Sequence, residues 1–181
     1  EQSGVTGNAV QIYGGGTGSI PITFENSDFI STERGCRNQD NGRSAVWVEE
    51  SFADFRNINV ISGDFGLSYR SSAGKVTDST INVNCNGVDI NGMITIGSNE
   101  YPTNVSNNVI TTADGTPITA YAGSLAEIHG NDLSGAASGS GIAVQSSRAT
   151  IHGNDIGPIG GWNGLWLIGS FGVDAQNNTI S

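Results

Sequence analysis

The chain has 181 residues and a formal net charge of -10, with 7 Lys and Arg residues against 17 Asp and Glu residues. This length predicts a single domain, residues 1–181, and the negative charge argues against nucleic acid or an anionic membrane as a partner, because both attract basic patches. No apolar stretch approaches the roughly 20 residues of a membrane span, and one residue alone is lysine. We therefore expect a secreted or cell-surface protein without membrane insertion, for which an acidic polysaccharide would need a bridging divalent cation.

From residue 24 onward, the chain repeats a pattern in which a central residue, often Asn, lies between two apolar residues. The intervals between successive central residues range from 21 to 31 positions. The copies are Phe24/Ser27/Phe29, Phe55/Ile58/Val60, Val76/Ser79/Ile81, Val105/Asn108/Ile110, Ile128/Asn131/Leu133, Ile151/Asn154/Ile156 and Ala175/Asn178/Ile180.

Short segments with alternating apolar residues lie between these copies, and most of them begin with glycine. They cover residues 45–48, 66–69, 87–90, 115–118, 141–144 and 164–167. Alternation of this kind predicts half-buried strands, and repeats that cannot bury their apolar faces alone predict a β-solenoid, here of about seven coils. The expected inward ladder is Val48, Tyr69, Ile90, Ile118, Val144 and Leu167.

The segment GIAVQSSRATIHGNDI, residues 141–156, resembles the coil of right-handed parallel β-helices of the pectin-lyase-like superfamily. The resemblance covers most of the chain from about Gly42 and implies an all-β, right-handed parallel β-helix. It implies no single activity, because this superfamily includes lyases, hydrolases, epimerases, tailspikes and adhesins. Since the chain begins with Glu1, we expect a processed mature form or an excerpt of a longer solenoid. The ends of the solenoid should then either continue in a longer chain or associate end to end with other copies.

Stacked coils bring repeated residues about 4.8 Å apart, so each repeated position becomes a ladder. Asparagine side chains satisfy backbone groups at turns, and we expect a structural ladder here. Its members are Asn108, Asn131, Asn154 and Asn178.

The motif His-Gly-Asn-Asp occurs twice and contains both histidines of the chain. His129 and His152 should point outward and stack, with Asp132 and Asp155 across the turn. We favour a solvent-exposed pair and keep a Zn or Cu site through these four residues as a minor alternative.

The two cysteines, Cys36 and Cys85, are compatible with one disulfide in an oxidising compartment, and two free thiols are the alternative.

In the superfamily that the chain resembles, the sheet formed by the glycine-led strands carries the sugar-binding groove of the enzymes. One expected outward row runs from Trp47 to Trp166 through Pro117, and the row beside it includes Thr119, with Tyr121 further along. Aromatic faces and interleaved polar groups are suited to carbohydrate. In the alternative, the insertions at 30–41 and 157–163 cover the tryptophans. The predicted ligand-binding residues are Trp47, Glu49, Arg70, Asp89, Asn91, Thr119, Tyr121, Gln145 and Trp166.

A polysaccharide lyase or glycoside hydrolase is the second functional hypothesis. The resemblance implies that a lyase needs a Lys or Arg base, usually with Ca²⁺ on carboxylates, and the one candidate set is Arg70, Lys75, Glu49 and Asp89. A hydrolase would pair Asp89 with Glu49 or Glu50 across two coils, about 10 Å apart. The motifs of polygalacturonases and alginate epimerases are absent. We therefore favour a non-enzymatic carbohydrate-binding or assembly role and expect no cofactor.

Overall fold

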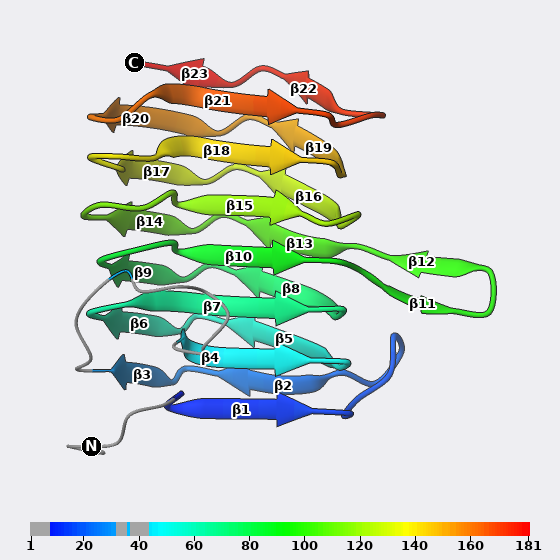
Figure 1. Ribbon diagram of the computed structural model, residues 1–181. Coiled ribbons are helices and arrows are strands. Elements are labelled where there is room, and N and C mark those ends of the chain that lie inside the picture. The colour runs from blue at the N-terminus through cyan, green and yellow to red at the C-terminus, as the bar shows by residue number, and fades with distance from the viewer. Residues whose placement is uncertain (1–7, 32–35, 37–43) are drawn as a thin grey trace.

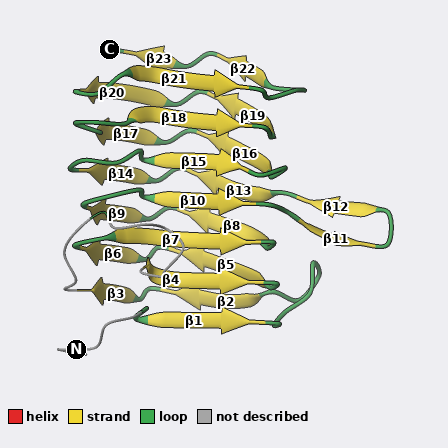
Figure 2. Cartoon of the chain, in the orientation of Figure 1, coloured by secondary structure: helices red, strands yellow, loops and turns green. Residues whose placement is uncertain are grey.

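The computed structural model describes residues 8–31, 36 and 44–181. These residues form strands and turns without any helix, and hence none that could cross a membrane (Figure 2). Most strands belong to three parallel sheets of seven strands each. The chain enters the three sheets in a fixed rotation, so successive strands stack from the N-terminal to the C-terminal end (Figure 1). The predicted all-β, parallel architecture is therefore confirmed, in a form consistent with a β-solenoid.

Sheet A contains the strands that were predicted from the glycine-led segments. Its strands, in spatial order, are β1 (Val10–Tyr13), β4 (Ser44–Glu49), β7 (Phe65–Arg70), β10 (Val88–Asn91), β15 (Ile118–Tyr121), β18 (Ser140–Gln145) and β21 (Asn163–Ile168).

Sheet B carries the first apolar residue of each repeat. Its strands are β2 (Ile22–Glu25), β5 (Phe52–Arg56), β8 (Ala73–Thr77), β13 (Thr103–Ser106), β16 (Leu125–His129), β19 (Arg148–His152) and β22 (Asp174–Gln176).

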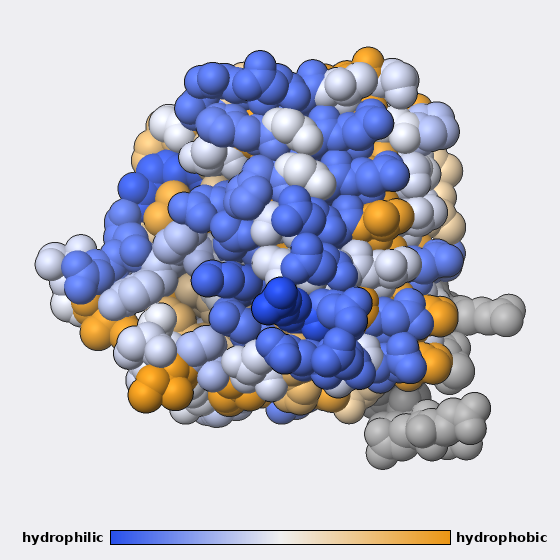
Figure 3. All heavy atoms as spheres, turned by 180° about the vertical axis from the view of Figure 1, so that it is seen from behind, coloured by the Kyte–Doolittle hydropathy of each residue, from blue (hydrophilic) through white to orange (hydrophobic). Residues whose placement is uncertain are grey.

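Sheet C carries the second apolar residue, and an antiparallel hairpin of β11 (Ile94–Ile96) and β12 (Asn99–Tyr101) projects between β10 and β13 (Figure 1). The outward faces of sheets B and C, seen from behind, are largely hydrophilic (Figure 3). The strands of sheet C are β3 (Asp28–Ser31), β6 (Asn59–Ser62), β9 (Thr80–Val83), β14 (Val109–Thr112), β17 (Asp132–Gly135), β20 (Asp155–Ile159) and β23 (Thr179–Ile180).

The register of sheet A differs from the prediction by two residues at β15. Ala120, and not Ile118, is in register with Ile90 and Val144. The prediction was wrong because it placed Gly115 at the start of the strand. Gly115 lies in the preceding turn, where a Cβ would come within 2.5 Å of the Cys85 backbone.

The core lies between the three sheets and consists of stacked aliphatic side chains, with aromatic rings toward the N-terminal end. Phe24 stacks on Phe55 with ring centroids 5.2 Å apart, and Tyr69 packs edge-on against Phe55. The Tyr69 hydroxyl, which is fully buried, donates a hydrogen bond of 2.9 Å to the Ala53 carbonyl. Toward the other end, Leu167 of the predicted ladder remains 45% exposed.

An asparagine ladder lines the turns between sheets B and C. The Asn108, Asn131 and Asn154 side chains each donate to the Oδ1 atom of the next asparagine, at 3.0, 2.9 and 2.8 Å, with Asn178 as the last member. Each side chain also donates to a carbonyl of the sheet B strand one level closer to the N-terminus. The preceding positions adopt positive φ, which explains why the sequence places Asn or Gly there.

Serines form a second set of turn residues, between sheets A and B, that the sequence analysis missed. The Ser51 amide donates to Ser72 Oγ at 3.2 Å, and the Ser124 amide donates to Ser147 Oγ at 3.1 Å. The residue before Ser51, Ser72 and Ser147 has positive φ in each case. These bonds satisfy buried amides and fix the corner beside the predicted groove.

Candidate functional site

All nine predicted ligand-binding residues lie on the outward face of sheet A. They occupy two columns that run along the stack, because outward residues alternate with core residues in every strand. The first column is Gln11, Trp47, Ser68, Asp89, Thr119, Ala143 and Trp166, and the second is Tyr13, Glu49, Arg70, Asn91, Tyr121, Gln145 and Ile168. Thr119 replaces the predicted Pro117 in the first column, and Tyr121 replaces Thr119 in the second.

Asp89 is the centre of a polar cluster on this face, where its neighbours cover it from solvent. Its carboxylate is completely buried and accepts hydrogen bonds from Thr119 Oγ1, from the Tyr121 hydroxyl at 2.9 Å and from Asn86 Nδ2 at 3.5 Å. Arg70 Nη2 lies 3.4 Å from Asp89 Oδ2. Burial raises the pKa of Asp89, while these hydrogen bonds and the Arg70 charge oppose the rise. A buried carboxylate requires such partners, so the cluster holds its members in fixed positions.

The Arg70 guanidinium lies between two aromatic rings. Its Cζ atom is 5.0 Å from the centroid of the Trp47 ring and 5.7 Å from that of Tyr121. Arg70 Nε is shielded from solvent and has no hydrogen-bond partner within the described part of the chain. Trp47 Nε1 donates to Glu49 Oε2 at 3.0 Å, which orients the indole. Cation–π contacts therefore hold Arg70 against Trp47 and Tyr121, and the Asp89 carboxylate binds Arg70 and Tyr121 from beneath.

A shallow hollow of about 320 Å³ continues this row toward the C-terminal end. Trp166 and Tyr121 form its aromatic walls, and Gln145 supplies an amide. Ala143 lies between Thr119 and Trp166 in the first column, and its small side chain leaves the space open.

The alternative, in which the insertions cover the tryptophans, holds at most in part. Trp47 and Trp166 are both half-buried, and Trp166 lines the open hollow. Of the first insertion, residues 32–35 and 37–41 lie outside the described residues.

The candidate catalytic set does not assemble as predicted. Lys75 lies on β8 in sheet B, where its amide donates to Asp54 Oδ1 at 2.9 Å. The prediction could not distinguish the sheets, because Lys75 follows Arg70 closely in the chain. Asp89 is in the groove wall but buried below Arg70 and Tyr121, so it cannot contact a substrate directly. Glu50 lies at the corner after β4, where its φ is 48°.

The two histidines stack in register on the outward face of sheet B, beside different partners. His129 Nε2 lies 3.1 Å from Asn104 Nδ2, and His152 Nε2 lies 3.3 Å from Asp174 Oδ2. Asp132 and Asp155 begin strands of sheet C on the other side of the turn. Among the described residues, no group of three or more His, Cys, Asp or Glu side chains could hold a metal ion.

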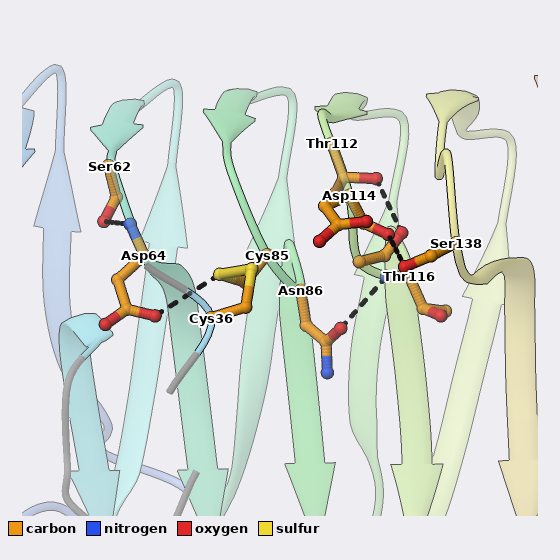
Figure 4. Close-up of a disulfide and its surroundings, with 10 residues drawn as sticks. Cys36, Ser62, Asp64, Cys85, Asn86, Thr112, Asp114, Thr116 and Ser138 are labelled. Atoms are coloured by element: carbon orange, nitrogen blue, oxygen red, sulfur yellow. Dashed lines mark hydrogen bonds between the residues drawn. A yellow bond between two sulfur atoms is a disulfide. The ribbon is translucent and has the colours of Figure 1, made fainter. Parts of the chain in front are cut away.

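Cys36 and Cys85 form a disulfide, with their Cα atoms 5.4 Å apart (Figure 4). Of the two alternatives, the structure therefore contains the disulfide and not two free thiols. Buried Asp64 lies below it, with Oδ1 3.4 Å from Cys85 Sγ. The disulfide joins the segment before β4 to the turn between β9 and β10, at the edge of sheet A where its strands begin.

Comparison with known proteins finds no matching family model, no matching curated protein and no matching solved structure.

Proposed function

We propose that the chain is a right-handed parallel β-helix of about seven coils, of the pectin-lyase-like kind, which binds a polysaccharide or surface glycan on the outward face of sheet A. The rotation of strands through three parallel sheets and the residue 141–156 motif support this fold. A disulfide and a surface with a single lysine favour a secreted or cell-surface location.

The observation that carries this proposal is the row of flat side chains on sheet A. Trp47, Arg70, Tyr121 and Trp166 follow one another along the stack, with five strand spacings, about 24 Å, from the first to the last. Aromatic faces pack against the C–H groups of sugars, and the neighbouring amide and carboxylate groups bind hydroxyls. An elongated row of this kind suits several consecutive residues of a glycan chain.

The face is also preorganised, which lowers the entropy lost on binding. Asp89 holds Arg70 and the Tyr121 hydroxyl from below, and Glu49 holds the Trp47 indole. Side chains that are already fixed do not need to be ordered by the ligand. Because Asp89 offsets the Arg70 charge and the protein has a net charge of -10, we expect an uncharged glycan to bind better than a polyanion.

The lyase or hydrolase alternative gains no support from this geometry. Its four candidates are divided between two sheets, and one of the required carboxylates, Asp89, is engaged as a buried anchor. The described residues therefore favour binding over catalysis.

A glycan array identifies the ligand, and titration with the best-binding oligosaccharide then tests the site. Trp166→Ala should weaken binding by about tenfold or more, because it removes an aromatic wall. Trp162→Ala is the matched control, since Trp162 is 75% exposed and lies outside the hollow. Ala143→Leu should also weaken binding, because the larger side chain fills the hollow.

Equal affinities for wild type, Trp166→Ala and Ala143→Leu would contradict the proposed site. An assay for unsaturated product and for reducing ends, with and without Ca²⁺, addresses the enzyme alternative. Activity lost in Arg70→Ala would overturn the preference for binding over catalysis.

A further inference from the structure

A second hollow, of about 330 Å³, lies on a different side of the molecule, over sheet B. Its floor comes from two neighbouring strands, β5 and β8, whose residues Phe52 and Ala73 are in register, as are Asp54 and Lys75. This hollow contains none of the residues assigned above to the glycan-binding face of sheet A.

Two insertions in the chain form the walls of this hollow. Both occur at the corner from sheet A to sheet B, at residues 14–21 and 92–102, whereas the corners at 50–51, 71–72 and 146–147 are short. The second insertion contains the β11–β12 hairpin that projects from the stack (Figure 1). The two long insertions belong to the strands that flank β5 and β8, so they rise on either side of the same floor.

The two insertions meet at Tyr101. Gly18 packs closely against this ring, because a Cβ at Gly18 would lie 2.6 Å from Tyr101 Cε1. The same ring packs against Phe52 in a T-shaped arrangement, with centroids 5.1 Å apart and an interplanar angle of 87°. Tyr101 therefore closes one side of the hollow, and its position is fixed by both the floor and the opposite wall.

The lining has an apolar side and a polar side. Phe52, Ala73, Tyr101 and two prolines form the apolar side. Asp54, Lys75, Asn104 and Glu127 form the polar side, as successive members of one outward column.

Several of these polar groups could form further hydrogen bonds or ion pairs with a ligand. Lys75, the one lysine of the chain, forms no ion pair with any described residue. Asn104 donates to Glu127 Oε2 at 3.0 Å, while its own Oδ1 has no partner in the described part of the chain. Partial burial raises the pKa of Asp54, against the effect of the nearby Lys75 charge.

We propose that this hollow is a second ligand site, which takes a single neutral pyranose residue. An apolar ligand would leave the acid, amide and ammonium groups without partners, which is costly on binding. A pyranose has a C–H face for Tyr101 and hydroxyls that can donate to carboxylates and accept from Lys75. The volume lies at the lower end for ligand pockets, so the site takes one sugar residue and not the interior of a polymer. It is independent of the glycan-binding face on sheet A.

The single lysine provides a direct probe of this site. Reductive methylation with ¹³C-formaldehyde gives one dimethyl-lysine signal in an NMR spectrum, identified by its absence in Lys75→Arg. The methyl pyranosides of glucose, galactose and mannose, and N-acetylglucosamine, are titrated through the millimolar range. We expect at least one of them to shift the Lys75 signal in a saturable manner.

Tyr101→Ala should weaken this response by about tenfold. Tyr13→Ala is the matched control and should leave it unchanged, because Tyr13 is exposed on β1. Glu127→Gln preserves the side-chain shape and should also weaken the response, so the test does not depend on the folding of Tyr101→Ala.

The proposal is overturned if no sugar of the panel shifts the wild-type signal, or if Tyr101→Ala and Glu127→Gln respond like wild type. Trp166→Ala should keep the full Lys75 response. Its loss in that variant would mean that the signal reports the sheet A face and would refute a second site. A failure of the sheet A proposal, in contrast, leaves the Lys75 response unchanged.

Discussion

Asn131→Ala should be among the most destabilising polar substitutions in this chain. Its side chain is nearly completely buried and takes part in four hydrogen bonds. Oδ1 accepts from the Asn108 amide and from Asn108 Nδ2, both at 3.0 Å, while Nδ2 donates to Val105 O and to Asn154 Oδ1, both at 2.9 Å. At about 1 kcal/mol for each bond, the loss is about 4 kcal/mol, because water cannot replace these partners.

Urea unfolding, followed by tryptophan fluorescence and compared at a common slope, measures this loss. Asn178→Ala tests the same ladder where it is half-buried, and should cost about 1 to 2 kcal/mol, because water can reach the freed groups. Asn82→Ala, at an exposed position of β9, should change stability by less than about 0.5 kcal/mol. A loss below about 1 kcal/mol for Asn131→Ala would refute the view that the ladder stabilises the stack.

Two further substitutions and the reduction of the disulfide test the buried groups. Burial raises the pKa of Asp89, so the folded protein retains this proton to higher pH than the unfolded chain does. The stability of the wild type relative to Asp89→Asn should therefore decrease as the pH rises above about 4. Thermal unfolding of both proteins from about pH 3 to about 8 measures this, and a stability difference that does not change with pH would contradict it. Breaking the Cys36–Cys85 disulfide, which links residues 49 apart in sequence, should cost about 4 kcal/mol in urea unfolding, and equal midpoints with and without reductant would contradict this. Tyr69→Phe removes the hydrogen bond to Ala53 O and should cost about 1 kcal/mol by the same method, whereas an unchanged or higher midpoint would indicate that the buried carbonyl needs no donor.

The repeat predicted the fold well because stacking constrains every coil in the same way. The spacing of residues such as Asn131 and Asn154 was sufficient to predict the ladder positions, and the alternation after Gly141 predicted a strand of sheet A. The error at Gly115 shows the limit of this reasoning. A glycine before a strand and a glycine in a tight turn look alike in sequence, and only the close approach to Cys85 distinguishes them.

The sequence was sufficient to predict which residues of the candidate site point outward from sheet A, but not which of them are buried. Alternation placed Asp89 and Arg70 outward, yet it could not show that Tyr121 would reach across and bury the carboxylate. The hollow on sheet B was missed, because its walls are insertions that belong to no repeat. Its one sequence signal was the unusual length of the segments at 14–21 and 92–102.

The proposed glycan-binding face can be tested most directly with the three tryptophans of the chain. Their indole N–H groups give three signals in a ¹⁵N NMR spectrum, assigned by single Trp→Phe variants. On titration with the oligosaccharide selected by the array, we predict that the Trp47 and Trp166 signals shift together, while that of exposed Trp162 does not. Saturable binding that leaves the Trp47 and Trp166 signals in place would contradict the assignment of this face.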